Sequence, residues 1–314
     1  MTEFEKDILS GLSAKKKYIH SKYFYDERGD ELFRKIMNMP EYYPTDAEHE
    51  IFSKHCDKLI SFLKSSNRGF NLIELGPGDG YKTKVLLEHL YKNGTDFKYI
   101  PIDISDNVIT LLTKNLKNEF PGLEIESRAE DYFVALDDIH KHTDRQLVVF
   151  FLGSNIGNLS EEESGAFLNE VSSKLNPGDK LLIGLDLKKD PHKIALAYND
   201  PQGITRDFNL NLLERLNREL GANFDLSKFI HYPTYDPENG TAKSFLVSKE
   251  DQIVYIEKLE KSFFFEAWEL IHTEISQKYD VEMIDLMAMQ SGFKVERNFY
   301  DSRRYFVDSL WVKV

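Results

Sequence analysis

The chain has 314 residues, of which 40 are lysine or arginine and 53 are aspartate or glutamate, so its formal charge at pH 7 is −13. Such a charge repels a phosphate backbone, and we expect no nucleic-acid partner. The length is sufficient for one large domain or two connected domains with a sizeable core.

Cys56 is the single cysteine, so no disulfide can form within the chain, and one thiol in an acidic chain is typical of a reducing compartment. No apolar run approaches the roughly 20 residues that span a bilayer. The N-terminal sequence MTEFEKDILSGL lacks the basic-then-apolar order of a signal peptide. We therefore expect a cytoplasmic protein without a membrane partner, a monomer whose partner is a small molecule.

In chain order, residues 1–46 are expected to be partly helical and end in an aromatic, proline-bounded loop with two exposed tyrosines, Tyr42 and Tyr43. Over residues 47–188, apolar runs such as FNLIELG, FKYIPID, LEIES, QLVVFFLG and DKLLIGLD alternate with helical patterns. That alternation predicts βαβ units and a parallel sheet.

Residues 189–278 break this alternation with a long helical stretch, ITRDFNLNLLERLNREL, followed by strand-like pieces, and are interpreted as an insertion that shapes a substrate pocket. From residue 279, one helix and two strand candidates predict a terminal antiparallel pair that completes the sheet. The fold class is α/β, a doubly wound, mostly parallel sheet with a second domain. We assign 47–188 plus 279–314 to a Rossmann-like cofactor domain and 1–46 plus 189–278 to a substrate domain.

Three glycines, Gly76, Gly78 and Gly80, follow an apolar strand and precede a helix in LIELGPGDGYKTKVLLEHL. Glycine lets the backbone turn sharply and approach a ligand, although a tight turn can require it for steric reasons alone. A dinucleotide fingerprint would need glycine where Tyr81 stands, which weakens a nicotinamide dehydrogenase. The pattern E-x-G-x-G-x-G from Glu74 instead resembles the first motif of class I methyltransferases.

Two later strands end in acids that suit a nucleoside. Asp103 closes FKYIPID, where a carboxylate can accept both hydroxyls of a ribose. The alternative role is a helix cap, for which Ser105 is better placed. In SRAEDYF, Asp131 can accept from an adenine amino group and Tyr132 can lie along the ring.

Taken together, the motifs resemble a family, the histidine Nα-methyltransferases of ergothioneine biosynthesis, relatives of which methylate tryptophan derivatives in fungi. The likeness runs from KYFYDERGDELFRKIMNMPEYYPT through ELGPGDGYKT, FFLGSNIGNLS, LDLKKDPHKIALAYNDPQGITRDFN and HTEISQKY to the final strand. The resemblance implies S-adenosylmethionine as cofactor, with S-adenosylhomocysteine as product. It places the cofactor against the glycine turn and its neighbours, namely Gly76, Gly78, Lys82, Asp103, Asp131 and Tyr132.

The same resemblance implies a substrate site. In FFLGSNIGNLS, Gly153 would bind the substrate and Asn158 would hold its carboxylate and amine. Asn158 could instead cap the following helix, a task for which Ser160 with Glu163 is better suited. Tyr198 would be a second carboxylate ligand. Tyr25 and Tyr42 would close the pocket, while aromatic residues taken alone are more often core.

Specificity is expected in IHTEISQKY. In an extended segment, Glu274 and Ser276 share a face and can grip the two ring nitrogens of an imidazole, while polar residues facing water are the alternative. The family's histidine enzyme has a methionine at the side-chain pocket, where this chain has Ser244.

The sequence therefore predicts an S-adenosylmethionine-dependent enzyme that methylates the α-amino group of a free amino acid, histidine first among them. Another amino acid, as the Ser244 departure allows, and a non-catalytic S-adenosylmethionine-binding protein are the alternatives. No metal-binding set is apparent in the sequence.

Overall fold

The structure is a computed structural model that describes residues 1–63 and 69–314. It divides into two compact units. Unit 1 comprises Met1–Tyr43 and Lys189–Gln277, and unit 2 comprises Pro44–Lys188 and Lys278–Val314. Within the described ranges, no helix combines the length and the apolar character that crossing a membrane requires.

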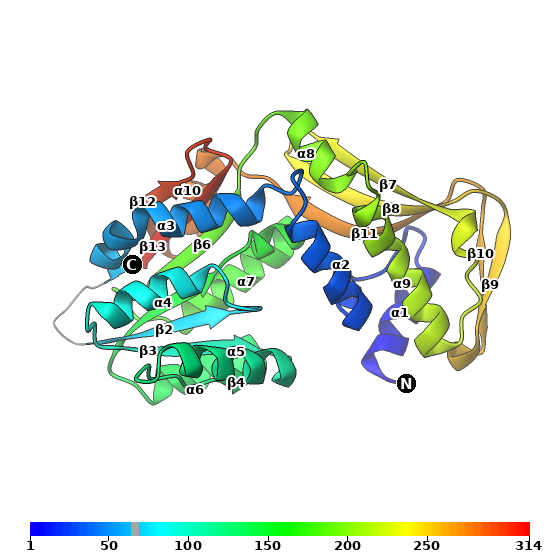
Figure 1. Ribbon diagram of the computed structural model, residues 1–314. Helices are drawn as coiled ribbons and strands as arrows, with labels where there is room; N and C mark the ends of the chain where they lie inside the picture. The colour runs from blue at the N-terminus through cyan, green and yellow to red at the C-terminus, as the bar shows by residue number, and fades with distance from the viewer. Residues whose placement is uncertain (64–68) are drawn as a thin grey trace. The chain divides into compact units, whose positions relative to one another are not determined.

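Unit 2 is built on a seven-stranded sheet in the order β12-β13-β6-β5-β2-β3-β4 (Figure 1). The strands are β2 (Phe70–Leu75), β3 (Phe97–Asp103), β4 (Arg128–Ala129), β5 (Gln146–Phe151), β6 (Lys180–Asp186), β12 (Phe293–Tyr300) and β13 (Phe306–Lys313). The strands from β6 to β4 run parallel, whereas β13 pairs antiparallel with both β6 and β12. The doubly wound, mostly parallel sheet with a terminal antiparallel pair is thus confirmed.

Helices cover both faces of this sheet. Its helices are α3 (Pro44–Leu63), α4 (Thr83–Lys92), α5 (Asp106–Glu119), α6 (Tyr132–Lys141), α7 (Glu161–Ser173) and α10 (Val281–Gln290). The first three pack on one face and the last three on the other. Each central strand is consequently buried on both faces, which explains its continuous apolar run.

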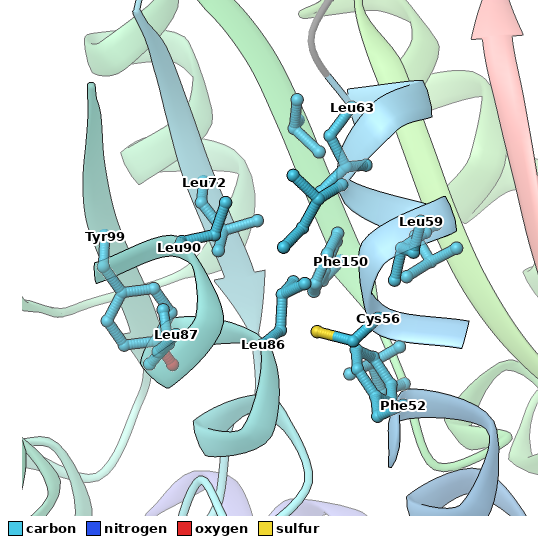
Figure 2. Close-up of a cluster of buried hydrophobic side chains, with 14 of the residues drawn as sticks. Phe52, Cys56, Leu59, Leu63, Leu72, Leu86, Leu87, Leu90, Tyr99 and Phe150 are labelled. Carbon is cyan, nitrogen blue, oxygen red and sulfur yellow. The ribbon is translucent and has the colours of Figure 1, made fainter. Parts of the chain in front are cut away.

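The core beneath α3 and α4 shows how the sequence builds this layer. Figure 2 shows Phe52 and Cys56 of α3 and Leu86 of α4 grouped beside Phe150 of β5. All four side chains are at most 3% exposed. Burial raises the pKa of the Cys56 thiol to about 12, so the thiol acts as a small apolar core group.

One predicted strand of unit 2 is much shorter than expected. The run LEIES contributes only a single parallel bridge, Ile125 to Tyr99, and β4 follows as two residues. This strand lies at the edge of the sheet and pairs on one side only. An edge strand that short offers few free backbone groups to another chain.

Unit 1 joins the N-terminal segment to the inserted segment. Its helices are α1 (Glu3–Ser13), α2 (Glu27–Met37), α8 (Pro191–Tyr198) and α9 (Ile204–Leu220). Its strands are β1 (Lys17–Tyr18), β7 (Phe229–Asp236), β8 (Thr241–Ser248), β9 (Gln252–Ile256), β10 (Lys261–Phe265) and β11 (Leu270–Gln277). They form one sheet in the order β1-β11-β8-β7 and a β9–β10 hairpin. Because β1 pairs with β11, segments far apart in the chain share one core.

Candidate active site

The glycine turn of unit 2 connects β2 to α4 in a backbone conformation that favours glycine. Gly76 and Gly78 have φ values of 66° and 57°. A Cβ built at Gly78 would meet no heavy atom within 4 Å, so the backbone here borders open space. A Cβ at Gly76 would lie 2.8 Å from the hydroxyl of Tyr132. The turn therefore leaves room for a ligand and lies close to the predicted adenine-binding residue.

Glu74, the last residue but one of β2, stabilises this turn. Its carboxylate accepts hydrogen bonds of 2.6 Å from the hydroxyls of Thr83, the first residue of α4, and Tyr99 of β3. Burial raises the pKa of Glu74, and both hydrogen bonds counteract that rise. The first acid of the E-x-G-x-G-x-G pattern therefore ties the turn, the helix and the neighbouring strand together.

Asp103 lies at the carboxyl end of β3, as expected for an acid that meets a ribose. Its Oδ1 accepts the N–H of Ser105 at 2.9 Å, and burial raises its pKa. Ser105, not Asp103, is the N-cap of α5. Ile104 between them is 83% exposed. Sequence reasoning missed this exposed apolar residue, whose signal was its place directly after the acid at the end of β3.

Asp131 and Tyr132 begin α6. Asp131 is the N-cap, accepting the N–H groups of Phe133 at 2.9 Å and Val134 at 3.2 Å. Burial, followed by the charges of Asp103 and Asp131, raises the pKa of Tyr132 to about 12. Tyr132 is thus close to Gly76 and lies within the electrostatic influence of Asp103 and Asp131. The acceptor oxygens and the aromatic ring of this group suit an adenosine.

Lys82 and Gly153 are joined by a residue that sequence reasoning missed. The Lys82 ammonium forms an ion pair with Oε2 of Glu48, and the Gly153 N–H donates to Oε1 of Glu48 at 2.8 Å. Glu48 is fully buried, whereas a quarter of the Lys82 side chain is accessible. The signal for Glu48 in the sequence was a charged residue at an otherwise apolar position of a helical pattern.

Asn158 ends a short turn of 3-10 helix, Asn155–Asn158, that follows β5. The next helix, α7, begins with a capping box of Ser160 and Glu163. Asn158 is partly exposed and is not the cap of that helix. Its amide is therefore available for another task at the carboxyl edge of the sheet.

In unit 1, β11 and β8 place three predicted specificity residues together. Glu274 pairs with Ser244 and Ser276 with Ala242 in the antiparallel register. The Ser244 hydroxyl donates to Oε2 of Glu274 at 3.4 Å. Ser244 and Ser276 are buried, and Glu274 is partly exposed. The segment is a strand, as the prediction that Glu274 and Ser276 share one face requires.

The predicted tyrosines of unit 1 belong to an aromatic group. Phe33 lies edge-on to Tyr25 at 5.6 Å between ring centroids and to Tyr42 at 6.3 Å. The surrounding protein and the charge of Glu274 raise the pKa of Tyr25, whose surface is nevertheless 47% exposed. Tyr25 therefore lies near the specificity residues, with part of its surface open to a ligand.

The last two tyrosines differ in their surroundings. Tyr198 is the partly exposed final residue of α8. Tyr43, expected to be exposed, is 6% exposed instead. The reason is Lys189, whose ammonium donates to the Tyr43 hydroxyl at 2.8 Å and lies 4.2 Å from the centre of its ring.

Comparison with known proteins gives one family. The model of the histidine-specific, SAM-dependent methyltransferases matches residues 4–313, which span both units. A histidine N-alpha-methyltransferase of Mycobacterium tuberculosis is 34% identical over 308 residues, covering 98% of this chain and 94% of that protein. Ergothioneine biosynthesis protein 1 of Schizosaccharomyces pombe is 30% identical over 289 residues, covering 90% of this chain and 37% of that protein.

Among solved structures, magnesium protoporphyrin IX methyltransferase from Synechocystis PCC 6803 with bound SAM is similar at a TM-score of 0.48. Its sequence is 12% identical, and the match covers 94% of this chain and 95% of that chain.

Proposed function

The chain belongs to the family of histidine-specific, S-adenosylmethionine-dependent methyltransferases, and from this premise we propose that it methylates the α-amino nitrogen of free L-histidine. The observation that carries the choice of substrate is the Glu274–Ser244 pair on adjacent strands, with Ser276 two residues along. A carboxylate and two hydroxyls offer acceptors and donors suited to both nitrogens of an imidazole.

The methyl donor fits the glycine turn of unit 2. Backbone N–H groups and open space beside Gly78 suit its methionyl part, and Asp103 suits the two hydroxyls of its ribose. Tyr132, Asp131 and the exposed Ile104 suit its adenine. When bound there, the cofactor supplies a methyl group on a positively charged sulfur.

Methyl transfer requires little of the protein beyond position. The amine lone pair has to lie in line with the methyl carbon at about 3–3.5 Å, and the amine has to be neutral. We assign Asn158 and Tyr198 to the substrate carboxylate and Tyr25 and Tyr42 to the amine pocket. The raised pKa of Tyr25 keeps its hydroxyl protonated at neutral pH, and its oxygen can accept an amine N–H. The proton lost by the amine leaves to solvent or a bound water.

The test is direct. Purified protein is incubated with labelled S-adenosylmethionine and each free amino acid in turn, and the products are separated by mass. We expect label in histidine, with one, two or three added methyl groups. Nα-acetylhistidine, whose amine is blocked, is the matched control and should take no label.

Two other outcomes have distinct meanings. Transfer to another amino acid points to Ser244, which is buried beside Glu274. Binding of S-adenosylhomocysteine without methyl transfer to any amino acid contradicts the proposed enzymatic activity. Cytoplasmic location and a monomeric state stay predictions, and size-exclusion chromatography of the same sample tests the second.

A further inference from the structure

A buried ion pair lies beneath the candidate cofactor site and is not part of the function proposed above. Glu48, in the second turn of α3, is 0% exposed, and both of its carboxylate oxygens are used. Oε2 meets the Lys82 ammonium and Oε1 accepts the N–H of Gly153. One side chain thus connects the start of α4 with the end of β5.

The interior of unit 2 is shaped for this carboxylate. A Cβ on Gly184 of β6 would lie 2.2 Å from Oε1 of Glu48 and 3.1 Å from the Gly153 nitrogen. Glycine at this position leaves the space that the carboxylate occupies. Burying a carboxylate and an ammonium costs several kcal/mol per ion even after relaxation. Apolar side chains of similar volume would be the ordinary filling, so stability alone is a poor reason for the pair.

The two segments that Glu48 joins both border the candidate site. Lys82 follows the glycine turn, and its Nζ would lie 3.3 Å from a Cβ at Gly153. After Gly153, with φ of 76°, comes Ser154 with φ of 57°, a left-handed conformation that is unfavourable for serine. The Ser154 hydroxyl accepts the N–H of Asp186 at 3.0 Å. Such a backbone persists only when its surroundings hold it, and the turn leads directly to Asn158.

We propose that Glu48 is a positioning residue for methyl transfer, which holds the Lys82 ammonium and the Gly153 turn at a fixed spacing. This inference rests on the proposed function, since we assign Lys82, which follows the glycine turn, to the methionyl carboxylate of the donor. An ammonium has three N–H donors, and the ion pair with Glu48 leaves others for that carboxylate. Glu48 acts through Lys82 and does not itself touch the ligand.

A second acid completes the cluster. Asp308 of β13 is fully buried, and neither of its oxygens receives a hydrogen bond from a donor among residues 1–63 and 69–314. Burial and the neighbouring charge of Glu48 raise the pKa of Asp308 well above its usual range. A proton on Asp308 would let its carboxyl group donate to Glu48 and would relieve the repulsion between the two buried acids.

Lys82 keeps its charge in this cluster. Burial is the largest influence and would lower the pKa of Lys82, but the charge of Glu48, its hydrogen bond and the other nearby acids together outweigh burial, and the pKa is raised. The ammonium is therefore present at neutral pH to meet an anionic ligand.

The experiment is a double-mutant cycle on binding of S-adenosylhomocysteine, measured by calorimetry on E48Q, K82M and E48Q/K82M. Each single variant should weaken binding about tenfold or more, because a charge-assisted contact is lost or misplaced. The double variant should bind no more weakly than K82M, because Glu48 acts only through Lys82. Effects that multiply, or an E48Q that binds as tightly as the unchanged protein, overturn the proposal.

The matched control is E50Q. Glu50 lies on the same helix and has the same kinds of partner, the Lys54 ammonium at 2.6 Å and the N–H of Ser302 at 2.9 Å. E50Q should leave the Kd for S-adenosylhomocysteine unchanged. In turnover assays E48Q should raise the KM for S-adenosylmethionine about tenfold and the KM for histidine much less, a split that general loss of structure would not produce.

Two further outcomes keep the test decisive. If E48Q does not fold, E48D retains the charge but is too short to reach both Lys82 and the Gly153 N–H, and its affinity should fall while its Tm stays close to that of the unchanged protein. An E48D with full affinity overturns the proposal. If the unchanged protein binds S-adenosylhomocysteine but methylates no amino acid, the proposed function fails while the binding cycle still tests Glu48.

Discussion

Gly184 and Glu48 are fitted to each other, because a Cβ at Gly184 would lie 2.2 Å from the Glu48 carboxylate. Gly184 lies in the middle of β6, where residues 181–183 and 185 are large and apolar, and its backbone conformation does not require glycine. The missing side chain is therefore explained by the space that the carboxylate needs. Glu48 and Gly184 are 136 residues apart in the chain, and no local pattern links them.

This relationship predicts that G184A displaces Glu48. The overlap should cost about 1–3 kcal/mol of the free energy of unfolding. Affinity for S-adenosylhomocysteine should fall as it does in E48Q. Urea unfolding and calorimetry measure the two effects. G165A is the control: a Cβ at Gly165, in α7, meets no atom within 4 Å, so its stability should be equal or higher. Unchanged affinity in G184A would contradict the fit.

Asp308 predicts a pH effect on stability with a definite sign. Its pKa is raised in the folded protein, so the folded state holds a proton that the unfolded state releases above about pH 4. The stability that the proton on Asp308 contributes is fully present below the pKa of Asp308 in the unfolded chain. It is lost as the pH rises toward the pKa of Asp308 in the folded protein. D308N lacks the titration, so its stability relative to the unchanged protein should rise by about 1.4 kcal/mol per pH unit in that window.

Urea unfolding of D308N and the unchanged protein at pH 5.5, 6.5 and 7.5 measures this slope. E50Q is the control, because Lys54 and Ser302 lower the pKa of Glu50 to about 2. Glu50 is then ionised in both states across the series, and the difference should stay nearly constant. A flat difference for D308N would mean that Asp308 is ionised in the folded protein.

Much of the fold follows from local sequence patterns. The apolar runs of β2, β3, β5 and β6 are continuous because each strand is covered by helices on both faces, and the helical run ITRDFNLNLLERLNREL is the observed α9. The edge strand was predicted too long, because the alternating apolar residues of LEIES suggest a full strand, whereas only one of them bridges to β3 and β4 itself has two residues. Burial of Tyr43 depends on Lys189, which no local pattern reveals.

The candidate site divides along the same line. Gly76, Asp103 and Asp131 could be predicted because each directly follows a strand or opens a helix, and parallel strands bring those points together. Glu48 and Asp308 could not, since each stands in an ordinary helical or strand segment and meets the other only through the tertiary fold. Lys82 was predicted only as a cofactor contact, whereas in the structure its ammonium also forms an ion pair with Glu48.

Asp103 predicts how cofactor binding depends on pH. Burial raises its pKa, and only the ionised carboxylate accepts from both ribose hydroxyls. Affinity for S-adenosylhomocysteine should therefore decrease in the unchanged protein as the pH falls from 8 toward the raised pKa of Asp103. D103N should bind about tenfold or more weakly at pH 8 and lose this pH dependence. D106N, an exposed change in the first turn of α5, should retain both affinity and pH dependence.

Glu274 predicts a change in substrate preference. If its carboxylate holds an imidazole N–H, E274Q removes a charge-assisted hydrogen bond worth about 1.5–3 kcal/mol, which lowers kcat/KM for histidine by about 10- to 150-fold. Binding of S-adenosylhomocysteine should change little, since that ligand is assigned to unit 2. E238Q, on the exposed turn between β7 and β8, is the control in the same unit and should keep full activity.

Ser244 supplies the complementary change. S244M removes the hydroxyl that donates to Glu274 and places a larger side chain at a position that is fully buried. Histidine turnover should fall, because Glu274 loses the hydroxyl that donates to it, while any activity on a larger amino acid should fall further because the methionine side chain fills space in the pocket. Competition assays with paired amino acids measure the ratio of kcat/KM values. A ratio that neither E274Q nor S244M alters would remove this strand pair from substrate recognition.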